Sequence, residues 1–190
     1  MTRMYFRPLL IFTIIFAAAF TRIVPHMPNV SPLNAIALFA AAHFRSRWQA
    51  LATPLAATWL SDLFLNNVTY AQPGQGFVWA YPGVYWQYLA YAAITLLGLS
   101  AFRSGVTPLR TVLAALGAGA VFFVVSNFGV WASGSLYPPT LQGLVACYAA
   151  AVPFYQGTLA GDAVFVSLLF GGFHLVQLKF SGLAAAPQLR

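Results

Sequence analysis

The sequence predicts an all-α membrane protein that crosses the bilayer about six times, as a single helical domain over residues 1–190. Of its 190 residues, 61% are apolar and only 6% are charged, whereas an ordinary soluble domain is about 25% charged. The apolar residues also form successive runs with short polar breaks, and a run of about 20 is typical of a transmembrane helix. Because so few charges cannot cover a surface in water, we interpret the chain as a polytopic membrane protein.

The first two apolar segments differ in length. The first follows Arg3 and Arg7, and we interpret it as a retained helix rather than a cleaved signal peptide, because the rest of the chain already needs membrane insertion. The second is short for a full span and opens with Ser31 as N-cap and Pro32 at the first helical position, which predicts a tilted or partial helix that begins inside the membrane. The predicted segments cover approximately 7–22, 32–44, 48–65, 84–102, 108–130 and 143–178.

The last segment is too long for one span. Pro153, Gly157 and Gly161 lie inside it, and these residue types often interrupt helices. We therefore expect a first half over about 141–154 that turns before the final spanning helix; whether this half spans or re-enters stays open.

The distribution of cations predicts the orientation, because cytoplasmic loops collect Lys and Arg. With the N-terminus inside, eight of the nine cations fall on the inner side and only Arg22 points outward. Both termini are then cytoplasmic, and loops 22–31, 66–83 and 131–142 face outward. The eight inner cations are Arg3, Arg7, Arg45, Arg47, Arg103, Arg110, Lys179 and Arg190.

Composition also argues against several partners and cofactors. The net charge of +7 is dispersed rather than gathered in a stripe, so we expect no nucleic-acid partner. The single cysteine, Cys147, can form no internal disulfide and has no second thiol with which to bind a metal. We predict no cofactor and no metal, and membrane lipid as the surroundings.

The two acids of the chain, Asp62 and Asp162, both lie in apolar segments. An ionisable group there costs about 3 kcal/mol or more unless it is paired or hydrated, so each is a candidate functional residue. The predicted topology brings both acids and Asn127 into the outer half of the membrane, at the level of the first outer loop. That loop supplies Arg22, His26 and Asn29.

This convergence predicts an outward-facing site for a small amphipathic ligand. The ligand-binding residues that we predict are Arg22, His26, Asn29, Asp62, Asn127, Trp131, Tyr148 and Asp162. Aromatic side chains that could line the cavity are Trp79, Trp86, Trp131, Tyr137, Tyr148 and Tyr155. Each has a structural alternative: Arg22 pairing with either acid to hold helices together, the aromatic residues forming an interfacial belt, Asn127 linking helices, and His26 being an ordinary loop residue.

Two stretches carry a family resemblance. One is Arg22-Ile23-Val24-Pro25-His26-Met27-Pro28-Asn29-Val30-Ser31-Pro32, and the other runs from Ser126-Asn127-Phe128-Gly129-Val130-Trp131 to Gly161-Asp162. They resemble a family of small bacterial inner-membrane proteins of unknown function to which a transport role is ascribed.

The chain more weakly resembles the S components of energy-coupling-factor vitamin transporters, which are six-helix proteins of similar size. That resemblance implies a vitamin-like substrate bound at the outer side and an energising transporter module docked on the first helix. Ala17, Ala18 and Ala19 offer small residues there, but the A-x-x-x-A spacing of that family is absent because Thr21 follows Ala17 four residues later.

Three functions remain open. The first is transport of a small organic solute. The chain has no G-x-x-x-x-G-K-[ST] loop, so the energy would come from a partner, an ion gradient or the solute's own gradient. Protonation of Asp62 or Asp162 could couple transport to protons. The second is a structural or accessory subunit without a ligand. The third is an intramembrane enzyme that uses both aspartates, which we disfavour because the G-x-G-D, G-x-S-x-G and H-E-x-x-H motifs are absent.

Overall fold

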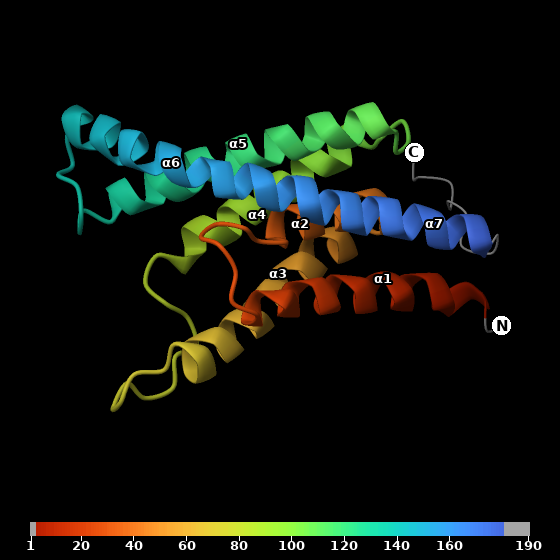
Figure 1. Ribbon diagram of the computed structural model, residues 1–190, viewed down its shortest axis with the longest axis horizontal. Helices are drawn as coiled ribbons and strands as arrows, with labels where there is room; N and C mark the ends of the chain where they lie inside the picture. The colour runs from red at the N-terminus through yellow and green to blue at the C-terminus, as the bar shows by residue number, and fades with distance from the viewer. Residues whose placement is uncertain (1–2, 181–190) are drawn as a thin grey trace.

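The computed structural model describes residues 3–180, and in this range the chain forms helices and no strand (Figure 1). This confirms the predicted all-α class, and the helix bounds match the predicted segments to within a few residues. Arg190 and the side chain of Arg3 lie outside the described part. The elements are α1 (Arg3–Phe20), the 3-10 turn η1 (Thr21–Ile23), α2 (Leu33–His43), α3 (Arg47–Phe64), the π-helical turn η2 (Leu65–Thr69), α4 (Val84–Ala101), α5 (Pro108–Ala132), α6 (Leu141–Val166), the π-helical turn η3 (Ser167–Gly171) and α7 (Gly172–Lys179).

The short helix α2 is the centre of the fold. Every residue from Leu33 to Ala42 is buried, and α2 contacts α1, α3, α4, α5 and α6. Its small residues let neighbouring helices approach: a Cβ added at Gly98 of α4 would lie 2.7 Å from Cβ of Ala41. At ~1.5 Å per residue its 11 residues span about 16 Å, roughly half of a ~30 Å hydrocarbon core, so α2 is too short for a full span, as the sequence predicts.

The predicted N-cap of α2 is wrong. Ser31 lies one residue too early: the helix begins at Leu33, Pro32 is the capping residue, and no side chain caps the first turn. The backbone N–H of Ile36 instead donates to the Pro32 carbonyl oxygen at 2.8 Å. The Ser31 hydroxyl is buried and has no hydrogen-bond partner among the described residues.

The predicted break in the last segment is also wrong. α6, η3 and α7 follow one another without interruption as a 39-residue helical stretch from Leu141 to Lys179, and Pro153 lies inside α6 (Figure 1). A helix within a bundle tolerates a proline because its neighbours can satisfy the backbone groups that the proline releases. Gly157 and Gly161 do not end the helix; they are four residues apart on one face, and the loop before α2 packs against them.

Two helices are long and apolar enough to cross a membrane, namely α5 and the stretch from α6 to α7. Each begins with a threonine cap: Thr107 accepts a hydrogen bond from the Arg110 N–H, and Thr140 accepts one from the Gly143 N–H. Much of their apolar surface is exposed, as at Leu109 (69%) and Leu168 (63%). The start of α1, the end of α7 and the α4–α5 connection lie at one end of the molecule, and the α3–α4 and α5–α6 connections lie at the other (Figure 1).

Candidate functional site

Arg22 and Asp62 form the one salt bridge found among the described residues. Arg22 stands in η1, directly after α1, and its Nη1 donates to Asp62 Oδ1 at 2.7 Å and to Ser61 Oγ at 2.7 Å. The other carboxylate oxygen, Asp62 Oδ2, accepts from the Tyr88 hydroxyl of α4 at 3.4 Å. Both oxygens of Asp62 are thus bonded, and the pair joins the end of α1 to α3 and α4.

Tyr81, in the connection before α4, lies close to this pair. Its phenol is partly buried, and this burial, together with the charge of Asp62, raises the pKa of Tyr81 above its usual value. Tyr81 therefore stays neutral at physiological pH and adds no charge to the pair.

The loop over residues 24–32 enters the bundle through a tight turn. The N–H of Val30 donates to the Met27 carbonyl oxygen at 3.1 Å, Pro28 follows Met27, and Asn29 has φ +61°. Proline at the second position and a positive φ at the third define a type II turn, and asparagine is among the few residues that adopt this conformation readily. The turn directs Asn29 at α6, where its Nδ2 donates to the Phe154 carbonyl oxygen at 3.4 Å.

The loop lies directly on the glycine face of α6. A Cβ at Gly157 would overlap the Pro28 carbonyl oxygen, and one at Gly161 would lie 2.8 Å from the Ser31 nitrogen. Only glycine leaves room for this approach. The two sequence stretches that carry the family resemblance, one around Pro28 and one ending at Asp162, are therefore in contact in the fold.

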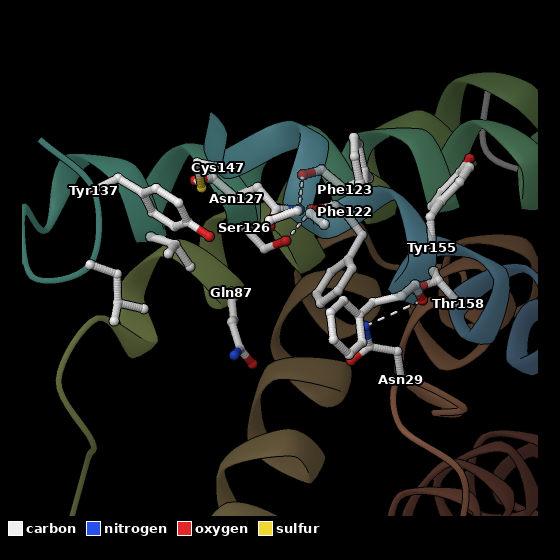
Figure 2. Close-up of a pocket in the computed structure, with 15 residues that line it drawn as sticks. Asn29, Gln87, Phe122, Phe123, Ser126, Asn127, Tyr137, Cys147, Tyr155 and Thr158 are labelled. Atoms are coloured by element: carbon white, nitrogen blue, oxygen red, sulfur yellow. Dashed lines mark hydrogen bonds between the residues drawn. The ribbon is translucent and has the colours of Figure 1, made fainter. Parts of the chain in front are cut away.

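Two adjoining cavities open between this loop, α4, α5 and α6. The larger has a volume of about 380 Å³ and the smaller about 210 Å³. Asn29, Gln87, Phe122 and Thr158 line both cavities, so the two are neighbours. Figure 2 shows the larger cavity, with Tyr137 towards one end and Asn29 and Thr158 towards the other. The larger cavity alone falls in the range of small-molecule sites, ~300–1,000 Å³.

The lining of the larger cavity combines amide, hydroxyl and aromatic groups. Asn127 and Ser126 come from α5, and Tyr155 from α6. Cys147 is buried, and its thiol donates to the Asn127 carbonyl oxygen at 3.4 Å, so it acts as a packing residue. Apolar surface with a few polar groups is typical of a site for a small amphipathic molecule.

The smaller cavity lies beside the salt bridge. Arg22, His26 and Ser31 line it from one side, and Asn34 and Tyr91 line it from α2 and α4. The His26 ring nitrogen Nδ1 is 2.7 Å from the Val24 carbonyl oxygen, which holds the ring against its own loop.

Asp162 lies deeper, between α6, α5 and α2. It is 3% exposed, and its Oδ2 accepts from Asn34 Nδ2 at 3.2 Å. On α5 the facing residue is Gly119, where an added Cβ would lie 3.1 Å from Oδ2. Oδ1 is buried and has no hydrogen-bond partner among the described residues.

The structure gathers some of the predicted site residues and separates others. Arg22, His26, Asn29 and Asn127 line a cavity, and so do the predicted aromatic residues Tyr137 and Tyr155. Asp62 and Asp162 flank the smaller cavity through their bonds to Arg22 and Asn34, without lining it.

Trp131 and Tyr148 line neither cavity: Trp131 joins α5 to the α5–α6 connection, and Tyr148 joins α6 to α5. The Trp131 indole N–H is shared between the carbonyl oxygens of Pro138 (3.1 Å) and Thr140 (3.2 Å), and the Tyr148 hydroxyl donates to the Val124 carbonyl oxygen at 2.7 Å. Trp79 and Trp86 do not line either cavity.

Sequence reasoning missed several lining residues, above all Gln87, Asn34, Thr158 and Phe122. Gln87 and Asn34 are polar residues inside apolar segments, which is the same signal that singled out the two acids. Thr158 and Phe122 carry no such signal, because threonine and phenylalanine are ordinary in membrane helices.

A family of unknown function (DUF6580) matches residues 2–188, almost the whole chain. The chain belongs to this family. No curated protein and no solved structure matches the DUF6580 chain. The chemistry of this DUF6580 site therefore follows from its own residues and their geometry.

Proposed function

We propose that this chain is a multi-pass membrane transport protein that binds a small organic solute, of vitamin-like size, in the paired cavities. The observation that carries the proposal is the pair of adjoining cavities, about 380 and 210 Å³, lined by polar groups from the 24–32 loop and from four helices. A helix bundle with only packing contacts has no need of such a polar cavity.

The apolar exterior supports a location in the membrane. The long helices α5 and α6 expose large apolar side chains along their length, for example Leu113 (58%) and Val145 (62%). Monomeric soluble proteins rarely expose apolar patches of this extent, whereas lipid covers them without cost.

The positions of the cations support the proposed orientation, with both termini in the cytoplasm. Arg103 lies in the α4–α5 connection, Arg110 in the first turn of α5, and Lys179 at the end of α7. These positions belong to the end of the molecule where α1 begins (Figure 1). The positive-inside rule assigns that end to the cytoplasm and the loops 65–83 and 133–140 to the outer side.

The lining indicates a neutral solute with a ring and several hydrogen-bonding groups. Asn29, Gln87 and Asn127 offer amides that can both donate and accept, and Phe122 and Tyr155 offer faces on which a ring can stack. The Arg22 charge is balanced by Asp62, so it gives no strong preference for an anion.

We also propose that solute uptake draws its energy from outside this chain. Without a phosphate-binding loop, uptake needs an energising module or an ion gradient.

The accessory-subunit alternative is favoured by one observation, the fully bonded Asp62, because a carboxylate that joins three elements is sufficient as a structural link.

A thermal-shift screen tests the proposal. The detergent-purified protein is screened against vitamins, their precursors and their metal complexes; a solute at ~100 times its Kd stabilises the folded state by about 2.7 kcal/mol. Gln87→Ala should abolish the shift, whereas Gln49→Ala, the same change at an exposed position of α3, should keep it. No hit across the screen, or a hit that survives Gln87→Ala, contradicts binding in these cavities.

A further inference from the structure

The two acids of the chain differ in one respect that bears on ion coupling. Asp62 is bonded to the guanidinium of Arg22, whereas Asp162 has no cation partner among the described residues. At 3% exposure Asp162 is the more deeply buried of the two. Burial of an unpaired carboxylate inside a membrane protein is unfavourable, so a neutralising ion is expected at Asp162.

The surroundings of Asp162 hold two unsatisfied oxygen atoms. Asp162 Oδ1 and Ser31 Oγ are both buried and without a partner among the described residues. The two residues are neighbours in the fold, because the Ser31 backbone packs on Gly161, the residue before Asp162, and Asn34, three residues after Ser31, donates to Asp162 Oδ2. Buried polar atoms without partners are uncommon in native proteins and call for an explanation.

We infer that Asp162 is a proton-binding site behind the lining of the smaller cavity, next to Asn34. A proton on Oδ1 removes the buried charge, while Oδ2 keeps the bond from Asn34. Ser31, Asn34 and Thr158 line the cavity, and Asn34 is bonded to Asp162, so a proton has a polar route from the solute site to Asp162. Its role rests on the proposed function, because the site would couple solute uptake to a proton gradient.

None of the described groups that face Asp162 supplies a free positive charge, so a proton is the simplest ion that could neutralise it. On α5 the neighbour is Gly119, and on α2 it is Asn34; neither titrates. On α6 itself Tyr155 is the nearest titratable group, since both it and Asp162 approach Gly119. Across the smaller cavity stand Arg22, His26 and Tyr91, and Arg22 is already paired with Asp62.

Infrared spectroscopy can test this inference directly, because the chain has only two side-chain carboxyl groups. The full chain is produced with aspartate carrying carbon-13 at the side-chain carboxyl and is purified in an alkyl glycoside detergent, which has no carbonyl group. The labelled band of a protonated carboxyl is then recorded at neutral pH in sodium chloride and in choline chloride of equal ionic strength. We expect the band in wild type and in Asp62→Asn in both salts, and its loss in Asp162→Asn.

Three results would overturn the inference. A labelled carboxylate and no protonated band in both salts would show that Asp162 stays ionised. A protonated band in choline that disappears in sodium would identify Na⁺ as the bound ion. A band that survives in Asp162→Asn would assign the proton to Asp62. If Asp62→Asn does not fold, the comparison of wild type with Asp162→Asn still decides, and none of these results depends on solute binding.

Discussion

The carbonyl oxygen of Pro28 occupies the place that a side chain of Gly157 would take. This contact fastens the 24–32 loop to α6 and so forms one wall of both cavities, because Asn29, the next residue, lines each of them. The position of the loop is thus decided by the absence of one methyl group on α6.

Gly157→Ala should therefore destabilise the protein. The added Cβ overlaps backbone, which cannot rotate away, and overpacking of this kind typically costs about 1–3 kcal/mol. Denaturant titration of the purified protein in detergent measures the change in the free energy of unfolding.

Gly172→Ala is the matched control. An added Cβ at Gly172 meets nothing within 4 Å, so only the higher helix propensity of alanine acts, and stability should stay constant or rise by up to about 1 kcal/mol. Equal effects of both substitutions would show that the loop does not pack on α6 in this way.

The sequence predicts the bounds of most helices but not the continuity of α6. Apolar run lengths predict where α1 to α5 begin and end, because each run is bounded by polar or turn residues. They cannot show whether Gly157 and Pro153 interrupt a helix, because that depends on what packs against them. The loop that fills the glycine face lies more than a hundred residues earlier in the chain.

The candidate site, too, could be predicted from the sequence only in part. That Arg22, His26 and Asn29 approach a polar region with the acids follows from topology and charge, yet which acid pairs with Arg22 does not. The pairing depends on which of α3 and α6 lies next to Arg22, and each of these helices carries its acid on a similar buried face, beside Thr58 and Ser61 in α3 and beside Thr158 and Gly161 in α6. Gln87 and Asn34 could have been predicted, since each is a lone amide in an apolar segment.

The two aspartates should respond differently to the same substitution. Asp62→Asn leaves Arg22, whose side chain is 16% exposed, without its partner, and breaking a buried pair in this way costs about 3 kcal/mol. Asp162→Asn leaves no cation behind and should cost about 1 kcal/mol or less, since only the bond to Asn34 changes.

The same denaturant titration compares the two variants with wild type. Arg22→Gln combined with Asp62→Asn should be less destabilising than the sum of the two single changes, because the two residues interact directly. An equal cost for Asp62→Asn and Asp162→Asn, with additive effects at Arg22 and Asp62, would contradict the pairing.

Filling the larger cavity should abolish solute binding without unfolding the protein. Ala151 lines this cavity, whereas Ala149, two residues earlier on the same helix, is exposed and does not. Ala151→Leu should remove the ligand-induced rise in Tm in the thermal-shift screen, and Ala149→Leu should retain it. Retention of the full shift in Ala151→Leu would move the solute site away from this cavity.

The proposed orientation can be tested by labelling single cysteines in spheroplasts. Cys147 is buried, and Cys147→Ser provides a background without reactive thiols. Ala71→Cys changes an exposed residue in the α3–α4 connection, and Ser104→Cys changes an exposed residue in the α4–α5 connection, at the opposite end of the molecule. A membrane-impermeant maleimide should label the cysteine at position 71 in intact spheroplasts and the one at position 104 only after permeabilisation. The reverse pattern would invert the topology and move the cavities to the cytoplasmic side, and labelling of both positions in intact spheroplasts would contradict a bundle that spans the membrane.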